Sequence, residues 1–300
     1  MKLILLVVIL FTAACFQAMA EPVQKPSAAE EALLLASLKT DNPWKKLNSK
    51  RLKLRSAAAL VLDHSGREIY ARKADKAMPI ASITKLMTAI VILDAQLAMD
   101  KKITITKQDR DLLRLTGSRL KVGAALSRRQ LLRLALMASE NRAATALART
   151  FPGGIRDFVM VMNRKARRLG MSESRFTDPS GLDAGNIASA RDLAKLVRAA
   201  SHYPLIKDAT TTTTLTVHPY RRKGPLKYGN TNRLLKNKAW QIGLSKTGYI
   251  NEAGRCLVMQ VEIKGEPVVI VLLNSFGKLT PFGDSNRIRK WIQSGSKTKG

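Results

Sequence analysis

Residues 82–93 read Ser-Ile-Thr-Lys-Leu-Met-Thr-Ala-Ile-Val-Ile-Leu, a polar start followed by a largely apolar run. The run is long enough to form a buried helix that begins at Ser82. A spacing of three residues places the Ser82 hydroxyl and the Lys85 amine on one helical face, within reach of each other. The helix start also offers free backbone N–H groups, which suit an oxyanion on a carbonyl attacked by Ser82. The stretch therefore predicts a serine nucleophile beside a lysine base.

The Ser-x-x-Lys pattern alone is weak evidence, because an isolated copy is ordinarily a helix cap followed by a solvated lysine. The same pattern recurs without a comparable apolar helix behind it at Ser118–Lys121, Ser275–Lys278, Ser294–Lys297 and Ser296–Lys299. Context therefore has to select the functional copy.

Two further motifs supply that context. Ser139-Glu140-Asn141 forms a polar break between two predicted helices, and Lys246-Thr247-Gly248 follows a strand-like run. Each alone would be read as an element boundary. Together with residues 82–85, in this order, they predict an acyl-transferring serine enzyme whose general base is lysine.

The N-terminus is typical of an exported protein. Lys2 precedes the apolar run Leu3–Phe11, and Ala18-Met19-Ala20 precedes Glu21, so residues 1–20 are predicted to be a cleaved signal peptide. The apolar run is short for a membrane anchor. Lipidation at Cys15 is the less favoured alternative, because the preceding residues form a poor lipoprotein box. We therefore expect a periplasmic protein.

Removal of the leader would leave Cys256 as the only cysteine. The mature chain would then have no internal disulfide, and its stability would come from a conventional core. Cys256 lies in the strand-like run Gly254–Val261, where it is interpreted as a small buried hydrophobe.

The formal charge of +30 falls by one, to +29, when Lys2 leaves with the signal peptide. Such an excess indicates a polyanionic partner. Export and an aromatic content of 5% argue against nucleic acid. Anionic envelope polymers or a membrane surface, contacted peripherally, are the favoured partners; a merely solvated surface is the alternative. The basic stretches that would meet them are Lys45-Lys46, Lys50–Arg55 and Tyr220–Lys223.

Pattern changes divide the mature chain into three parts. Residues 21–55 form a basic, mostly flexible arm with one short helix at about 28–38, residues 56–293 form the folded domain, and residues 294–300 form a polar tail. A hairpin is expected from Ala57–Asp63 and Arg67–Ala71. Helices are expected at about 82–97, 128–138, 142–149, 155–169, 190–200 and 282–292, and strands at 240–247, 255–263 and 267–274. Strands at both ends with helices between predict an α+β fold, with one antiparallel sheet built from both chain ends and flanked by helices.

The chain resembles the low-molecular-mass penicillin-binding proteins of the D-alanyl-D-alanine peptidase family, and within it the endopeptidase group. The distinctive segments are Pro79–Thr88, Ala138–Ala144, Phe176–Leu182 and Asn230–Leu234. About fifty residues follow Lys246-Thr247-Gly248, so we expect neither the second domain nor the amphipathic anchor of the membrane-bound carboxypeptidases. The resemblance implies the penicillin-binding protein/β-lactamase-like fold.

The resemblance also implies a role for each motif. Ser82 would attack a D-alanyl carbonyl, Lys85 would take its proton as a free amine, and Ser139 would relay a proton to the leaving amine. Burial and the nearby Lys246 ammonium would lower the pKa of Lys85. Penicillins would acylate Ser82, as covalent inhibitors.

The remaining implied residues bind substrate. Asn141 would hold a substrate amide, Lys246 and Thr247 would bind a carboxylate, and Gly248 would let the strand lie against the substrate backbone. The N–H groups of Ser82 and Tyr249 would form the oxyanion hole.

No cofactor or metal is expected, because the three histidines are scattered. Asp178 and Asp183 are interpreted as turn residues, with a part in deacylation as the alternative. The favoured function is cleavage of D-alanyl cross-links in peptidoglycan. The alternatives are a carboxypeptidase, more distantly a β-lactamase, and a catalytically silent cationic envelope-binding protein.

Overall fold

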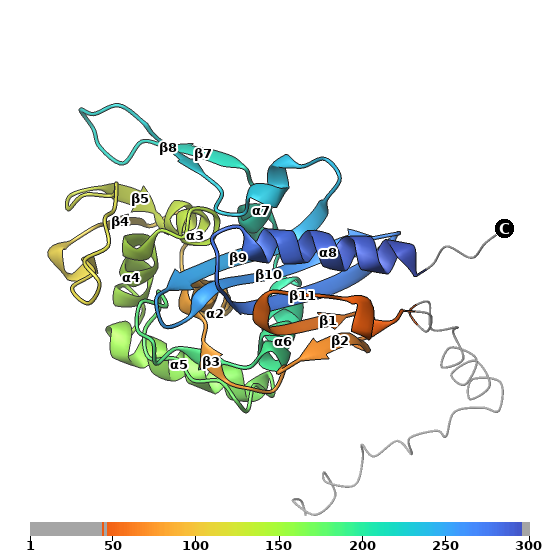
Figure 1. Ribbon diagram of the computed structural model, residues 1–300. Helices are drawn as coiled ribbons and strands as arrows, with labels where there is room; N and C mark the ends of the chain where they lie inside the picture. The colour runs from red at the N-terminus through yellow and green to blue at the C-terminus, as the bar shows by residue number, and fades with distance from the viewer. Residues whose placement is uncertain (1–43, 45–46, 296–300) are drawn as a thin grey trace, which may run out of the picture. The chain divides into compact units, whose positions relative to one another are not determined.

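The computed structural model describes Trp44 and residues 47–295, and its centre is one five-stranded antiparallel sheet (Figure 1). The strand order β2-β1-β11-β10-β9 joins the two ends of the domain, because β1 pairs with β11 and Leu60 lies opposite Val271. The strands are β1 (Ser56–Leu62), β2 (Glu68–Arg72), β9 (Gln241–Ile250), β10 (Gly254–Ile263) and β11 (Glu266–Ser275). The predicted α+β fold with a sheet built from both chain ends is confirmed.

Helices cover both faces of the sheet, as expected. The C-terminal helix α8 (Thr280–Ser294) packs on one face and α6 (Ala190–Ala200) on the other (Figure 1). Behind α6 lies α2 (Thr84–Asp94), where every residue from Thr84 to Ile92 is buried. A helix that is enclosed on all sides needs no polar face, which explains the continuous apolar run.

Helices and three pairs of short strands form the rest of the domain. The helices are α3 (Arg128–Met137), α4 (Asn141–Arg149), α5 (Gly154–Arg168) and α7 (Pro204–Thr211). The paired strands are β3 (Met78–Pro79) with β6 (Ile187–Ala188), β4 (Lys102–Thr104) with β5 (Ala125–Ser127), and β7 (Thr214–Val217) with β8 (Leu226–Gly229). The sequence reading missed α7 and all three pairs.

Two expected boundaries differ by three residues in the structure. The helix predicted for about 82–97 is a 3₁₀ turn, η2 (Ala81–Ile83), that continues into α2 and ends at Asp94. It stops there because Gln96 takes a positive φ of 48°, which ends the helical run. Strand β9 extends to Ile250, so the Lys246-Thr247-Gly248 motif lies inside it.

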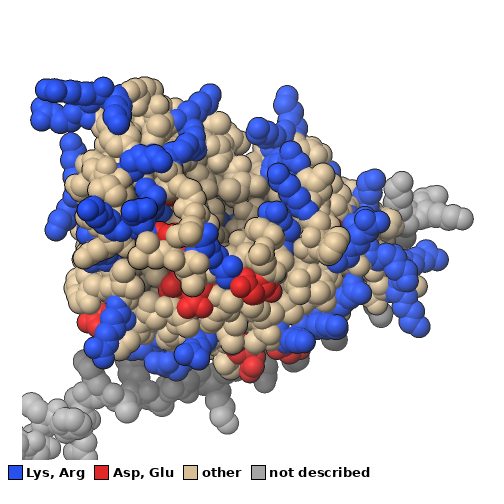
Figure 2. All heavy atoms as spheres, turned by 60° about the vertical axis from the view of Figure 1, so that its left-hand side comes forward, with Lys and Arg blue, Asp and Glu red and all other residues tan. Residues whose placement is uncertain are grey.

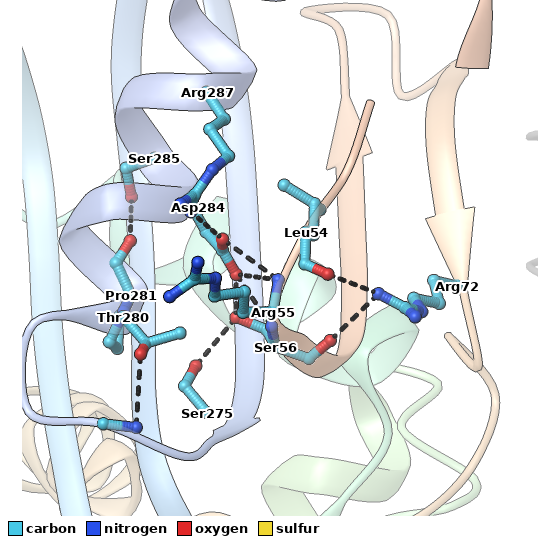
Figure 3. A network of polar contacts seen from close by, with 11 residues as sticks. Leu54, Arg55, Ser56, Arg72, Ser275, Thr280, Pro281, Asp284, Ser285 and Arg287 are labelled. Atoms are coloured by element: carbon cyan, nitrogen blue, oxygen red, sulfur yellow. Dashed lines mark hydrogen bonds and ion pairs between the residues drawn. The ribbon is translucent and has the colours of Figure 1, made fainter. Parts of the chain in front are cut away.

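A buried carboxylate ties the start of the sheet to α8 (Figure 3). Asp284 accepts hydrogen bonds from the backbone N–H of Arg55 at 2.9 Å and from both the N–H and the hydroxyl of Ser56 at 2.7 Å. Arg287 pairs with the same carboxylate at 2.7 Å. Leu52 and Leu54 are also buried. Residues 47–55, expected to be part of a flexible arm, therefore belong to the folded domain.

The other expectations for the ends of the chain lie outside the described residues. They are the signal peptide at 1–20 with Cys15, the short helix at 28–38, Lys45-Lys46 and the tail beyond 295. Within the described part of the chain, no helix is both long and apolar enough to cross a bilayer.

Candidate active site

The three sequence motifs converge at one point of the fold. Ser82 lies in η2 at the start of α2, Ser139 lies between α3 and α4, and Lys246 lies on β9. Strand β9 is one of the two edge strands of the sheet, and it packs against η2. The topology thus places a serine, a second serine and two lysines around the end of one buried helix.

Lys85 is fully buried, and its amine has three polar partners. Nζ lies 2.8 Å from Ser82 Oγ, 2.8 Å from Asn141 Oδ1 and 2.6 Å from the Ser180 carbonyl oxygen. The last two atoms can only accept hydrogen bonds. A neutral amine has two hydrogens and one lone pair, so donation to these two acceptors leaves its lone pair facing the Ser82 hydroxyl.

Burial lowers the pKa of Lys85 to about 7, although the Asp178 and Glu140 carboxylates partly oppose the shift. A lysine buried without a direct counter-ion disfavours its charged form. About half of the molecules would carry the free amine at neutral pH. Burial is the main cause of the downward shift of the Lys85 pKa, and the repulsion between the two lysines that the sequence reading invoked acts on both amines.

Lys246 is the second fully buried lysine. Its Nζ donates to Ser139 Oγ and to the Thr247 carbonyl oxygen, both at 2.9 Å. Burial, followed by repulsion from Lys85, holds the pKa of Lys246 well below its usual value. Ser139 itself takes a positive φ of 57°, a backbone conformation that is uncommon for a residue with a side chain.

Two glycines enclose the turn that carries Ser82. A Cβ atom on Gly248 would lie 2.8 Å from the Ile80 carbonyl oxygen and 3.2 Å from Ser82 N. A Cβ on Gly181 would lie only 2.0 Å from the Ala81 carbonyl oxygen, and Gly181 has a φ of +81°. The close contact between β9 and the turn that carries Ser82 therefore requires a glycine at position 248. The family pattern implied a glycine here for a different reason, the close approach of the substrate backbone. Sequence reasoning did not single out Gly181.

The remaining predicted residues line the open side of the site. Thr247 Oγ1 lies 2.7 Å from Thr231 Oγ1. The Tyr249 side chain is 48% exposed, and the Arg255 guanidinium stacks 3.6 Å from its ring centroid. Thr231 and Arg255 were not predicted, although Thr231 falls in the distinctive segment Asn230–Leu234.

These residues border a cleft of about 740 Å³. Figure 2 shows a face that is hollowed near its middle; Lys and Arg side chains are spread over this face, and a few Asp and Glu side chains lie below the hollow. The other lining cations are Arg114, Arg233 and Lys278. Arg114 connects its own loop to two other segments, because its Nε donates to the Leu182 carbonyl oxygen at 2.5 Å and its Nη2 pairs with Glu252 at 2.8 Å. Sequence reasoning did not predict these cations, although Arg233 falls in the distinctive segment Asn230–Leu234.

Asp178 organises the loop that supplies the Ser180 carbonyl. Its carboxylate accepts hydrogen bonds from the N–H and hydroxyl of Ser180 and from the N–H groups of Gly181 and Asp183. This is the turn role that the sequence favoured. Burial raises the pKa of the Cys256 thiol to about 12, so this cysteine stays protonated. The described residues contain no group of three or more His, Cys, Asp or Glu side chains arranged to hold a metal.

Comparison with protein families gives one match over most of the chain, the D-alanyl-D-alanine carboxypeptidase family S11, at residues 45–277. The chain belongs to this family of serine peptidases. Family S11 membership makes it a serine hydrolase and a penicillin-binding protein by fold, which confirms the resemblance seen in the sequence.

Two relatives within the family are more than 40% identical to this S11 peptidase. A D-alanyl-D-alanine endopeptidase of Pseudomonas aeruginosa is 47% identical over 246 residues, 82% of this chain and 79% of that protein. A D-alanyl-D-alanine endopeptidase of Escherichia coli is 43% identical, over 80% of this chain and 78% of that protein.

Solved structures agree with this S11 assignment. The Streptomyces K15 DD-transpeptidase superposes with a TM-score of 0.75 at 26% identity, covering 81% of this chain and 98% of that one. The ampicillin-bound form of penicillin-binding protein D2 from Listeria monocytogenes superposes with a TM-score of 0.69 at 32% identity, covering 81% of this chain and 99% of that one.

Proposed function

We propose that this S11 peptidase is a periplasmic serine D,D-endopeptidase that hydrolyses D-alanyl cross-links in peptidoglycan through an acyl-enzyme on Ser82. The observation that carries the proposal is the buried Lys85 amine, with a pKa of about 7, placed 2.8 Å from Ser82 Oγ beside an open cleft. That arrangement supplies a free base at the nucleophile near neutral pH.

Acylation follows from this geometry. The Lys85 amine takes the Ser82 proton as Oγ forms a bond to the D-alanyl carbonyl carbon, and the N–H groups of Ser82 and Tyr249 stabilise the oxyanion. Ser139, held by Lys246 at 2.9 Å, relays the proton taken by Lys85 to the leaving amine as the C–N bond breaks, so that the Lys85 amine is free again. Water then attacks the ester carbonyl and gives a proton to Lys85, and this proton passes to Ser82 Oγ as the ester bond breaks.

Substrate binding uses the rest of the cleft wall. Asn141 holds a substrate amide, and Gly248 allows the substrate backbone to lie along the free edge of β9. Lys246 and Thr247 bind a substrate carboxylate. Penicillins enter the same cleft and acylate Ser82; the ampicillin-bound and cefotaxime-bound structures of the Listeria relative support this expectation.

Cleavage of cross-links is favoured over removal of terminal D-alanine. The relatives named D-alanyl-D-alanine endopeptidase are 36–47% identical to this chain, whereas those named carboxypeptidase are 29–32% identical. Carboxypeptidase activity is the second candidate, because the same acyl-enzyme serves both reactions.

Export and surface charge set the expected location and contacts. The leader pattern at residues 1–20 supports a periplasmic protein. The turn between β7 and β8 exposes Arg221, Arg222 and Lys223. Together with the +29 charge of the mature chain, these side chains would hold the enzyme on anionic envelope polymers or, peripherally, on a membrane surface. Binding to isolated cell walls should therefore weaken as salt rises.

Two measurements test the proposal. Mass spectrometry of the mature protein after penicillin treatment should detect one penicilloyl adduct, which Ser82→Ala should abolish without unfolding the protein. Purified residues 21–300 should convert cross-linked muropeptide dimers to monomers faster than they release D-alanine from pentapeptide. An adduct on Ser82→Ala would refute the nucleophile. Rapid D-alanine release with intact dimers would favour the carboxypeptidase.

A further inference from the structure

An irregular loop forms one wall of the cleft and reaches the catalytic lysine through a chain of hydrogen bonds. The loop runs between η3 (Lys107–Asp109) and β5. Its Thr116 Oγ1 lies 2.7 Å from Asp111 Oδ2 and accepts a hydrogen bond from Asn141 Nδ2 at 3.1 Å. Asn141 Oδ1 in turn accepts from Lys85 Nζ. The side chains of Asp111, Thr116, Asn141 and Lys85 thus form one hydrogen-bonded series from the loop to the base.

The charge state of Asp111 sets the direction of these hydrogen bonds, that is, which group donates and which accepts. Its carboxylate accepts the N–H groups of Leu113, Arg114 and Thr116, each at 2.9 Å. Partial burial acts to raise its pKa, but the hydrogen bonds from Arg114 and Thr116 hold that pKa below the usual value. An ionised carboxylate only accepts hydrogen bonds. The single hydroxyl hydrogen of Thr116 is therefore donated to Asp111, and its oxygen is left to accept from Asn141.

The direction matters because the Asn141 amide has two different ends. With its NH₂ end held by Thr116, its oxygen faces Lys85 and accepts one of the amine hydrogens. If the amide turned over, its NH₂ group would face Lys85 and donate to the amine lone pair. That lone pair would then be occupied, and it could not take the proton of Ser82.

We propose that Thr116 and Asp111 are positioning residues that hold the Asn141 amide oxygen toward Lys85, and so aim the Lys85 lone pair at the Ser82 hydroxyl. The inference rests on the acyl-enzyme chemistry proposed above. It gives the cleft loop a part in the rate of acylation that is separate from contact with substrate.

Thr116→Val tests the proposal, because valine keeps the shape of threonine and removes the hydroxyl. Its acylation rate with a fluorescent penicillin should fall about tenfold, the effect of losing one ordered hydrogen bond from the reactive arrangement. Thr116→Ser keeps the hydroxyl and should stay within about twofold of the unchanged protein. Ser118→Ala is the matched control, since Ser118 Oγ accepts from Leu120 N at 3.0 Å in the same loop but lies outside the chain to Lys85.

Asp111→Asn is a second, independent variant. It should slow acylation to a similar extent, and the double variant with Thr116→Val should be no slower than Thr116→Val alone, because both changes release the same amide. Thermal unfolding midpoints of all variants show which of them are folded at the assay temperature, and rates are compared among those.

The outcomes separate this inference from the proposed function. The positioning role would be overturned if Thr116→Val were acylated as fast as the unchanged protein, if Thr116→Ser were as slow as Thr116→Val, or if Ser118→Ala slowed acylation as much as Thr116→Val. In each of these cases the unchanged protein would still be labelled at Ser82. If the unchanged protein acquired no penicilloyl adduct, the proposed function would fail first and the positioning role with it.

Discussion

The protonation of Lys85 should control the rate of acylation, and the structure sets both the pH and the size of the effect. Burial lowers the pKa of this amine to about 7, and only the free amine can take the Ser82 proton. The rate should therefore be lost as pH falls through about 7, and it should reach a plateau above that pH.

The expected magnitude follows from the fraction of free amine. At pH 5, roughly two units below the pKa, about one molecule in a hundred carries the free amine, so acylation should be about 100-fold slower than on the plateau. With the ordinary lysine pKa of 10.5, the rate would instead keep rising about tenfold for each pH unit from 7 to 9. The two cases are readily distinguished.

The assay is single-turnover acylation by a fluorescent penicillin between pH 5 and 9, with the folded state checked at each pH. Lys246→Arg is the control, because the pKa of Lys246 is lowered too, whereas an arginine at this position stays charged and does not titrate in this range. The break near pH 7 should persist in Lys246→Arg. A rate that is flat across the range, a rate that still rises tenfold per unit at pH 9, or a break that disappears in Lys246→Arg would refute the assignment of the base to Lys85.

Two further predictions separate the lysines and test the glycine on β9. Lys85→Arg should nearly eliminate acylation because a guanidinium cannot act as a base near neutral pH, whereas Lys246→Arg should retain more activity; equal losses in penicillin labelling would count against the base role. Gly248→Ala should slow acylation at least tenfold, because the new Cβ would lie 2.8 Å from the Ile80 carbonyl oxygen and force β9 away from Ser82. Gly243→Ala, on the same strand, would meet only the Gln260 carbonyl oxygen at 3.8 Å and should change the rate little.

Local patterns were sufficient to predict the main elements of the fold. Strands β10 and β11 are apolar runs bounded by turn residues, and α6 is capped by Ser189, whose hydroxyl accepts from Asp192 N. Helix α7 was missed although Pro204 occupies its first turn, a position typical of proline. Its C-terminal end lies in the run of threonines at 210–214, whose β-branched side chains favour strands when read without tertiary contacts.

Contacts between distant segments could not be predicted in the same way. The short strands β3, β4 and β7 each pair in a separate two-stranded sheet, and two to four residues carry too little periodicity to be recognised. The loop containing Asp111 has no regular structure to predict. Its order comes from one carboxylate that collects several N–H groups, and an aspartate in a loop does not by itself reveal how many donors surround it.

In the candidate site, the sequence predicts which atoms react, but it does not predict the environment that makes them reactive. The residue types and the spacing of Ser82 and Lys85 indicate which atoms react, since that spacing is local to one helical turn. The pKa of Lys85, however, depends on burial and on acceptors that lie 56 and 95 residues away, on Asn141 and Ser180. Without that enclosure the lysine would be a solvated ammonium and the motif only a helix cap. The fold therefore converts a common four-residue pattern into a base, and it does so chiefly by excluding water from one amine.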